Sequence, residues 1–166
     1  MLTPLKLRGC HVLVQQRIAG VGLNIAWPYL SSAQKQSFKG QTRKIMLKLL
    51  TITDYDRSTP SYVVEDDDPC KHRGIQERER RILFDGQASD DLGLAHNDLN
   101  WSNIIVDDDV IVGVVDWEMA GWFGRDRPAK VHRQIRMPDH GTYSHVPGMT
   151  EERLADLLYW NDLYDF

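Results

Sequence analysis

Apolar residues recur with a helical period between residues 32 and 51. The members of this stripe are Phe38, Ile45, Met46, Leu49 and Leu50. Ser31 stands just before the stripe and Gln34 follows three residues later, which is the sequence signature of a capping box. The pattern therefore predicts an amphipathic helix over residues 32–51, and we expect its apolar face to pack into the core.

A different pattern, typical of strands, lies further along the chain. Two β-branched runs, residues 104–106 and 110–115, flank the triplet Asp107-Asp108-Asp109. Two such runs around a short polar segment predict a β-hairpin. We interpret the three aspartates as turn residues and not as metal ligands, because aspartate commonly occupies tight turns.

Shorter signals complete the pattern. Residues 12–14 predict a buried strand. Residues 54–75 are rich in acidic residues and proline, which predicts an exposed loop with a solvated acidic run. Residues 76–84 predict a short helix, and Thr150 is the expected N-cap of a helix at the C-terminal end.

Composition narrows the class of protein. The chain has 166 residues, 42% apolar and 27% charged, as expected of one ordinary globular domain. The net charge of −4 gives no indication of a nucleic-acid partner. Cys10 and Cys70 are too few for a disulfide framework, and no signal or membrane-spanning pattern is present. We expect a cytoplasmic protein with no membrane partner.

The charges are unevenly distributed. Residues 1–50 contain eight Lys or Arg and no acidic residue, whereas residues 51–100 and 101–166 each contain six basic and twelve acidic residues. We expect the basic and acidic segments to attract each other within one domain. A basic arm that binds an external polyanion remains an alternative.

Polar residues with catalytic potential flank the predicted hairpin. The sequence reads His96-x-Asp98 and then Asn103 before it, and Asp116-x-Glu118 after it. Phosphoryl transfer from a nucleotide needs a carboxylate that accepts the proton of the attacking hydroxyl, and an amide and a second carboxylate that hold magnesium. A two-metal hydrolase that uses the three carboxylates is the weaker alternative.

The expected hairpin register gives a rough geometry. If Val106 pairs with Val110, Asn103 lies opposite Gly113, and Asp116 lies three residues beyond, on the order of 10 Å along the strand. The three polar groups then gather at one end of the hairpin. A curled loop between Asp98 and Asn103 must close the remaining distance.

These motifs resemble those of the aminoglycoside phosphotransferase and choline kinase-like family, which has a protein-kinase-like fold. The family typically reads H-G-D-x-x-x-x-N and later I-D-W-E. This chain has His96-Asn97-Asp98 and Val115-Asp116-Trp117-Glu118. Residues 17–20 and 160–164 resemble uncharacterised fungal members. Asn97 stands where glycine is usual, and asparagine tolerates left-handed backbone angles better than most residues.

The resemblance implies roles for individual residues. Asp98 is then the catalytic base, and Asn103 and Asp116 are magnesium ligands, with Glu118 as an auxiliary acid near the metal. His96 holds the loop through hydrogen bonds. The implied cofactors are Mg²⁺ and ATP or another nucleoside triphosphate.

The resemblance also implies an α+β fold, namely a mainly helical C-terminal lobe with a β-hairpin that carries the motifs. Residues 1–20 then correspond to the last N-lobe strand and the hinge, where Gln16 and Ile18 contact the nucleotide, and residues 21–166 form the C-lobe. No glycine-rich phosphate loop is recognisable, and no acidic residue precedes Asp54. The N-lobe is therefore expected to be missing.

The functional expectation is a small-molecule kinase that phosphorylates a hydroxyl group, impaired by the lack of an N-lobe. The alternative is a non-catalytic, truncated lobe that acts as a binding module, or a gene-model fragment. Self-association through the uncovered docking surface is expected in that case. The acceptor is unknown. Several residues either line its side of the cleft or lie on the surface: His132, Arg133, Arg136, His140, Tyr143 and His145.

Overall fold

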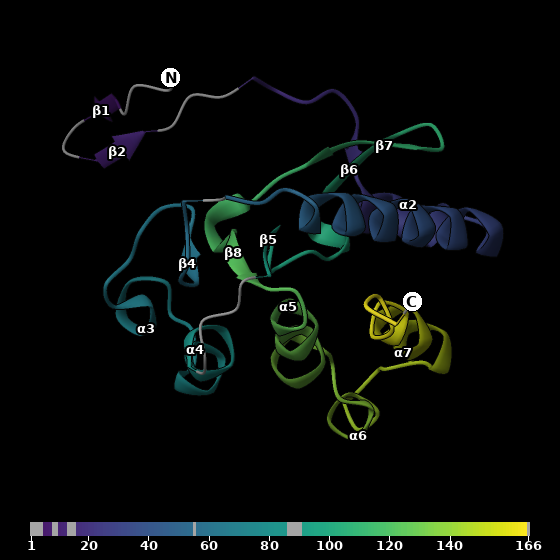
Figure 1. Ribbon diagram of the computed structural model, residues 1–166. Coiled ribbons are helices and arrows are strands. Elements are labelled where there is room, and N and C mark those ends of the chain that lie inside the picture. The colour runs from purple at the N-terminus through teal and green to yellow at the C-terminus, as the bar shows by residue number, and fades with distance from the viewer. Residues whose placement is uncertain (1–4, 8–9, 13–15, 55, 86–90, 166) are drawn as a thin grey trace.

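The computed structural model describes residues 5–7, 10–12, 16–54, 56–85 and 91–165, with side chains from residue 16 onward. Small antiparallel sheets combine with helices, so the predicted α+β class is confirmed (Figure 1). The strands are β1 (Leu5–Leu7), β2 (Cys10–Val12), β3 (Val21–Gly22), β4 (Ser61–Tyr62), β5 (Leu92–Ala95), β6 (Ile104–Asp107), β7 (Val110–Val114) and β8 (Gly121–Gly124).

The α-helices are α1 (Leu23–Ala26), α2 (Ser32–Leu50), α3 (Pro69–His72), α4 (Glu77–Phe84), α5 (Arg127–Val131), α6 (His140–Tyr143) and α7 (Glu151–Leu158). Three short 3-10 turns are η1 (Trp27–Tyr29), η2 (Trp101–Asn103) and η3 (Trp117–Met119), and η4 (His132–Arg136) is a π-helical turn. No helix within the described residues is both long enough and apolar enough to cross a membrane.

Helix α2 forms where the sequence predicts it. The backbone N–H of Gln34 donates to Ser31 Oγ at 3.3 Å, and the Gln34 side chain accepts from the Ser31 N–H at 3.0 Å. This capping box satisfies donors that the first helical turn leaves free. Phe38 and Met46 of the predicted stripe are buried. Helices α4 and α7 confirm two further predictions, and Thr150 caps α7 by accepting from the Arg153 N–H at 3.2 Å.

The predicted hairpin is present as β6 and β7, but its register differs from the expected one. Val106 lies opposite Ile111 and not Val110, because Asp107 pairs with Val110 and closes a two-residue turn, and the pairing shifts by one further residue between Ile105 and Val106. A bulge of this kind places two residues of one strand opposite one of the other. The shift brings Asn103 next to Val115, whose N–H donates to the Asn103 carbonyl at 2.9 Å.

The aspartates of this hairpin serve its turn, as predicted. Asp108 adopts a left-handed conformation with φ of 49°. Asp109 is held from α2, because Gln34 Nε2 donates to its carboxylate at 2.9 Å and Gln41 Nε2 donates to its carbonyl at 2.8 Å. Figure 1 shows α2 running along the β6–β7 hairpin that these bonds attach to it.

The prediction of an exposed loop over residues 54–75 is wrong in part. β4 pairs with β8, which also pairs with β5, so this segment contributes a strand to the second sheet. Tyr62 is only 1% exposed and packs against Phe84 and Phe123. A two-residue strand is too short for an alternating pattern to reveal it. Of the strand predicted over residues 12–14, Leu13 and Val14 lie outside the described part of the chain.

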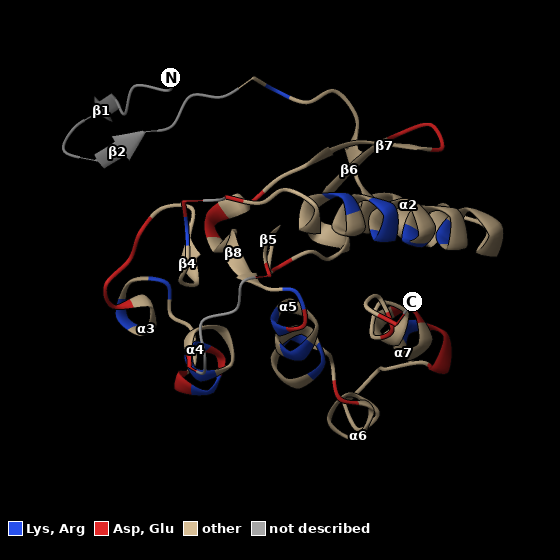
Figure 2. Cartoon of the chain, viewed as in Figure 1, with Lys and Arg blue, Asp and Glu red and all other residues tan. Residues whose placement is uncertain are grey.

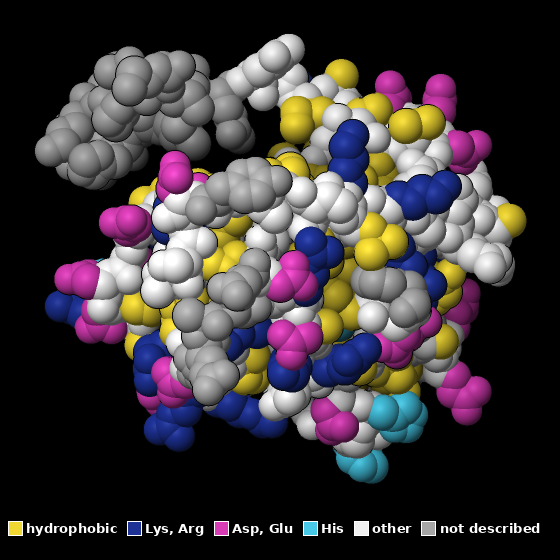
Figure 3. All heavy atoms as spheres, viewed as in Figure 1, with side chains coloured by type: hydrophobic (Ala, Val, Ile, Leu, Met, Phe, Trp, Pro, Cys, Tyr) yellow, Lys and Arg dark blue, Asp and Glu magenta, His cyan; other side chains and the backbone are white. Residues whose placement is uncertain are grey.

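Two apolar clusters form the core. The first joins α1, α2, β6 and the C-terminal segment through residues that include Trp27, Phe38, Ile104 and Leu163. The second lies around Tyr62, Leu83, Phe123 and Val131. Apolar side chains also remain exposed along the upper edge in Figure 3, near β3, β6 and β7, where Val21, Val110 and Val112 are exposed.

The predicted attraction between basic and acidic segments is confirmed. Figure 2 shows several lysine and arginine positions, in blue, along α2. Lys35 Nζ lies 2.6 Å from the carboxylate of Asp156, and Arg43 lies 3.4 Å from that of Asp162, which also pairs with Lys39. These ion pairs attach the C-terminal segment to α2.

Candidate active site

The loop after β5 is held by His96. Its side chain is buried, and burial lowers its pKa, so the neutral ring is favoured. Its Nε2 lies 2.9 Å from the carbonyl oxygen of Val115, the residue before Asp116. Trp117 is 41% exposed, and its ring centroid lies 4.7 Å from that of His96. His96 thereby ties the loop to the end of the hairpin.

Asn97 occupies the position where the family motif usually has glycine. Its φ is 62°, in the left-handed region that glycine adopts without strain. Asparagine is among the residues that tolerate this region, so the departure from the motif is accommodated by the backbone. The loop can therefore turn between His96 and Asp98 in this chain.

Asp98 and Asn103 are in direct contact. The Asn103 side-chain N–H₂ donates to the Asp98 carbonyl at 2.8 Å and to its carboxylate at 3.3 Å. The Asp98 carboxylate is half-buried, whereas Asn103 is buried. The amide is thus oriented, and among the described residues its oxygen accepts only from Ser102 Oγ, at 3.3 Å.

Asp116 lies just beyond the end of β7, the strand that pairs with β6. It directly follows Val115, whose N–H donates to the Asn103 carbonyl, so the bulged register places Asp116 one residue beyond Asn103's partner. Its φ of 63° is again left-handed. Its carboxylate makes no hydrogen bond or ion pair within the described part of the chain, and the residue is exposed.

The three carboxylates of the motif do not form one tight cluster. In the described ranges, the one group of three acidic, histidine or cysteine side chains within 4.8 Å of one another is elsewhere. Asp98, Asp116 and Glu118 are therefore not gathered within that distance of one another. Glu118 is exposed, and its backbone carbonyl accepts a hydrogen bond from Arg73.

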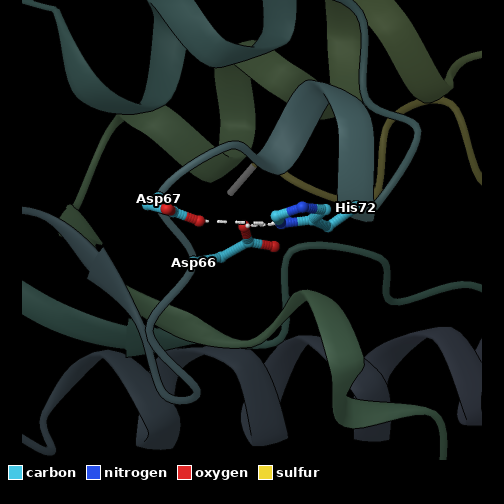
Figure 4. A group of neighbouring side chains, drawn as sticks. All are labelled: Asp66, Asp67 and His72. Carbon is cyan, nitrogen blue, oxygen red and sulfur yellow. Dashed lines mark hydrogen bonds and ion pairs between the residues drawn. The ribbon is translucent and has the colours of Figure 1, made fainter.

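The compact group consists of Asp66, Asp67 and His72, beside α3 (Figure 4). His72 Nδ1 lies 2.9 Å from Asp66, and this hydrogen bond raises the pKa of His72, which favours a protonated ring unable to bind a metal. The second Asp66 oxygen lies 2.9 Å from Arg73 Nε. The group is satisfied by its own ion pairs, in line with the predicted solvated acidic run.

The residues Asn103 and Asp116 suit a magnesium ion. Both residues offer hard oxygen donors, namely the amide oxygen of Asn103, whose nitrogen is hydrogen-bonded, and the carboxylate of Asp116. Mg²⁺ in nucleotide enzymes takes few protein ligands. Glu118 follows two residues after Asp116 on the same exposed turn.

Gln16 and Ile18 lie in a cavity of about 740 Å³. Asp116 and Glu118 line the same cavity, which also includes Ile105. Gly113 leaves room for the Ile18 side chain, because a Cβ on Gly113 would lie 2.5 Å from Ile18 Cδ1. The structure therefore brings the predicted nucleotide contacts and two predicted metal contacts to one hollow.

Asp98 lines a separate, smaller cavity of about 180 Å³. Of the residues left open by the sequence, His132 and Arg136 line this cavity, whereas Arg133, His140 and His145 do not. Arg136 Nε lies 3.7 Å from the Asp98 carboxylate. Asp98 therefore lines the cavity that holds Arg136, whereas Asp116 lines the larger cavity, which includes neither Asp98 nor Asn103.

Sequence reasoning missed Glu79, which lies behind Arg136. Glu79 is 1% exposed, and Arg136 donates to its carboxylate at 2.7 Å. Burial raises the pKa of Glu79. A signal was present, because Glu79 stands one helical turn before Leu83, on the buried face of α4. An acidic residue on an apolar helix face requires a partner, although the sequence does not identify it.

A sequence model of the phosphotransferase enzyme family (APH) matches residues 44–123. This range contains Asp98, Asn103, Asp116 and Glu118, and leaves out Gln16 and Ile18. A search of curated proteins found no match.

Proposed function

We propose that this chain binds a magnesium nucleoside triphosphate and transfers its terminal phosphoryl group to a hydroxyl of a small molecule, because residues 44–123 match a sequence model of the phosphotransferase enzyme family. Residues 16–166 then act as a kinase-like C-lobe with its hinge. The proposal is carried by one observation, the contact between Asn103 and Asp98 at a strand end that adjoins Asp116.

In this proposal Asp98 is the general base. Its half-buried carboxylate faces the smaller cavity, where an acceptor hydroxyl can reach it. The Asn103 amide holds the Asp98 backbone and one carboxylate oxygen, which fixes the direction in which the proton is accepted. Most of the catalysis comes from such positioning, because phosphoryl transfer asks little covalent chemistry of the protein.

Asn103 and Asp116 would hold the metal. Magnesium held there would neutralise charge on the phosphates of the nucleotide. The side chains of Asn103 and Asp116 extend from paired strand ends, so their separation is set by the hairpin. His96 maintains that geometry by bonding the carbonyl of Val115 while remaining neutral.

The larger cavity suits the nucleotide. Its volume of about 740 Å³ falls within the range of about 300–1,000 Å³ that is usual for small-molecule sites. Ile18, Ile105 and Val114 supply apolar surface for a base, and Asp116 lies in the same hollow. A nucleotide that lies along this cavity brings its phosphates toward the metal ligands.

Calorimetric titration with Mg-ATP tests the proposal. We expect saturable binding to the wild-type chain, and at least a tenfold loss of affinity in Asp116→Ala, with a comparable loss when EDTA replaces magnesium. Asp67→Asn is the matched control, since it removes an exposed carboxylate from the α3 cluster outside the site. The absence of heat from a folded wild-type chain, or an equal loss in Asp67→Asn, refutes the proposal.

A second function, a non-catalytic binding module, is favoured by the exposed apolar side chains Val21, Val110 and Val112. Exposed apolar patches mark protein contacts in many folds. Light scattering after size exclusion separates the two functions when it is combined with a turnover assay. Self-association without nucleotide binding supports the module, and a monomer that consumes ATP supports the enzyme.

A further inference from the structure

Two carboxylates share one guanidinium beside the proposed base. Arg136 Nη2 donates to Glu79 Oε1 at 2.7 Å, and Arg136 Nε lies 3.7 Å from Asp98 Oδ1. The first contact is a hydrogen bond, whereas the second is an ion pair that is too long for one. Arg136 Nε is buried and makes no hydrogen bond within the described residues. The guanidinium therefore faces Asp98 without being bonded to it.

The two carboxylate oxygens of Asp98 differ as a result. Oδ2 accepts a hydrogen bond from the side-chain nitrogen of Asn103 at 3.3 Å. Oδ1 accepts none in the part of the chain that the structure describes, and the Asp98 side chain is 28% exposed. A hydrogen bond from a guanidinium favours the ionised form of a carboxylate, so it makes the carboxylate a weaker proton acceptor. Oδ1 is thus the oxygen that remains available to accept a proton.

Glu79 holds Arg136 on the side away from Oδ1. The Glu79 side chain is only 2% exposed. Burial raises its pKa and Arg136 lowers it, so the charge of Glu79 depends on the guanidinium. A buried charge that loses its partner is strongly destabilising, whereas the more exposed Asp98 is partly solvated. The hydrogen bond of Arg136 therefore goes to Glu79 and not to Asp98.

The local backbone also directs Arg136 toward this pair of carboxylates. Arg136 is the last residue of the π-helical turn η4, in which the Met137 N–H donates to the His132 carbonyl at 2.9 Å. Such turns are rare and are frequent at functional sites. Arg133, in the same turn, pairs with Asp165 instead. Of these two arginines, Arg136 is the one that the turn places beside the proposed base.

We propose that Glu79 is a positioning residue for the base: by bonding Arg136 it keeps the guanidinium away from Asp98 Oδ1, and this oxygen accepts the proton of the attacking hydroxyl. The inference rests on the proposed phosphotransferase function. The hydroxyl oxygen bonds to phosphorus, its proton passes to Oδ1, and the bond from phosphorus to the nucleoside diphosphate breaks. Without the charge of Glu79, Arg136 moves to Asp98 and bonds the oxygen that the reaction needs.

Turnover of Glu79→Gln tests this role. Release of ADP from Mg-ATP is followed with water and with glycerol as acceptors. We expect kcat to fall at least tenfold, since a general base contributes about 10²–10⁴-fold. The KM for Mg-ATP should change less than threefold. Glu77→Gln is the matched control, because Glu77 pairs with Arg80 and Arg81 on the exposed face of the same helix. Wild-type kcat in Glu79→Gln, or an equal loss in Glu77→Gln, overturns the proposal.

Unfolding in urea tests the contact without any turnover. In the wild type Asp98 is not bonded to Arg136, so Asp98→Asn should change the urea midpoint little. In the Glu79→Gln background Asp98 becomes the partner of Arg136, so the same substitution should lower the midpoint at least twice as much. An ion pair that serves only the fold predicts equal shifts in the two backgrounds, and equal shifts overturn the proposal.

A crystal structure of the wild-type chain with magnesium and the ATP analogue AMP-PNP provides a test that does not depend on the folding of Glu79→Gln. Arg136 should remain bonded to Glu79, and a hydrogen bond from Arg136 to Asp98 Oδ1 overturns the proposal.

These measurements also separate the inference from the function on which it rests. A wild-type chain that releases no ADP contradicts the phosphotransferase function, while the urea midpoints still decide whether Glu79 holds Arg136 away from Asp98. A wild-type chain that releases ADP, with kcat unchanged in Glu79→Gln, supports the function and overturns the role of Glu79.

Discussion

The side-chain nitrogen of Asn103 lies 2.8 Å from the backbone oxygen of Asp98, and 3.3 Å from one oxygen of its carboxylate. One amide therefore shapes the loop that carries the proposed base, and its oxygen is the atom that would bind the proposed metal. The two functions of Asn103 are coupled, because the nitrogen cannot be turned toward Asp98 without directing the oxygen away from it.

Asp98→Asn should separate catalysis from binding. The substitution keeps the shape of the side chain but removes the carboxylate that accepts a proton, so we expect turnover to fall by roughly 10²–10⁴-fold. Mg-ATP affinity should change less than threefold. Phosphorylated product is measured by ³¹P NMR with a panel of small-molecule alcohols as acceptors. Turnover near the wild-type rate in this variant would show that Asp98 is not the base.

Two glycines should respond to alanine in opposite directions. Gly20 has a φ of 125°, and a Cβ there would lie 2.5 Å from the Val106 carbonyl oxygen. We expect Gly20→Ala to lower the free energy of unfolding by about 1–3 kcal/mol. Gly40 lies within α2 with open space around it, so Gly40→Ala should raise it by about 0.5–1 kcal/mol. Urea titrations measure both, and the same sign for both would contradict this account.

Arg73 should stabilise the segment next to Asp116. Its guanidinium donates to the carbonyls of Glu118 and Val64 and pairs with Asp66, so three parts of the chain depend on one side chain. We expect Arg73→Ala to lower the free energy of unfolding by about 1–3 kcal/mol, because hydrogen bonds to charged groups are lost.

Arg81→Ala is the matched control for Arg73→Ala. Arg81 pairs with Glu77 on an exposed part of α4, and such surface pairs contribute little. Chemical denaturation of the two variants should therefore differ clearly. Equal midpoints would mean that the Arg73 contacts add no stability.

The free energy of unfolding should fall in mild acid because His96 and His132 become protonated. Burial lowers the pKa of both histidines in the folded chain. The unfolded chain then binds protons first, so their contribution is complete above about pH 6.5 and is lost as the pH falls through the lowered folded-state pKa values. Each histidine contributes up to about 1.4 kcal/mol per pH unit in that window.

Urea midpoints at several pH values measure this loss, and His132→Gln gives the comparison. Glutamine retains a side-chain N–H for the Trp160 carbonyl but does not titrate, so the variant should show a shallower fall below pH 6.5. His72 acts in the opposite sense, because Asp66 raises its pKa, but it is exposed. Parallel pH profiles for the variant and the wild type would contradict the prediction.

Local structure was predictable where neighbours in sequence decide it. The Ser31 and Gln34 capping box, the apolar stripe of α2 and the Thr150 cap of α7 all depend on residues within one or two turns. The β-branched runs of the hairpin are similarly local. The motif from Asp98 to Asp116 was readable as well, because residue types and spacing indicate phosphoryl-transfer chemistry.

Only the tertiary structure decided how these parts meet. The bulge between Ile105 and Val106 sets the strand register, and a shift of one residue changes which side chains adjoin Asp116. Arg136 reaches both Glu79 and Asp98 from a π-helical turn, across 57 and 38 positions of sequence. Such contacts arise from packing of the whole core, since a buried charge takes whichever partner the fold brings near, and no local pattern encodes that partner.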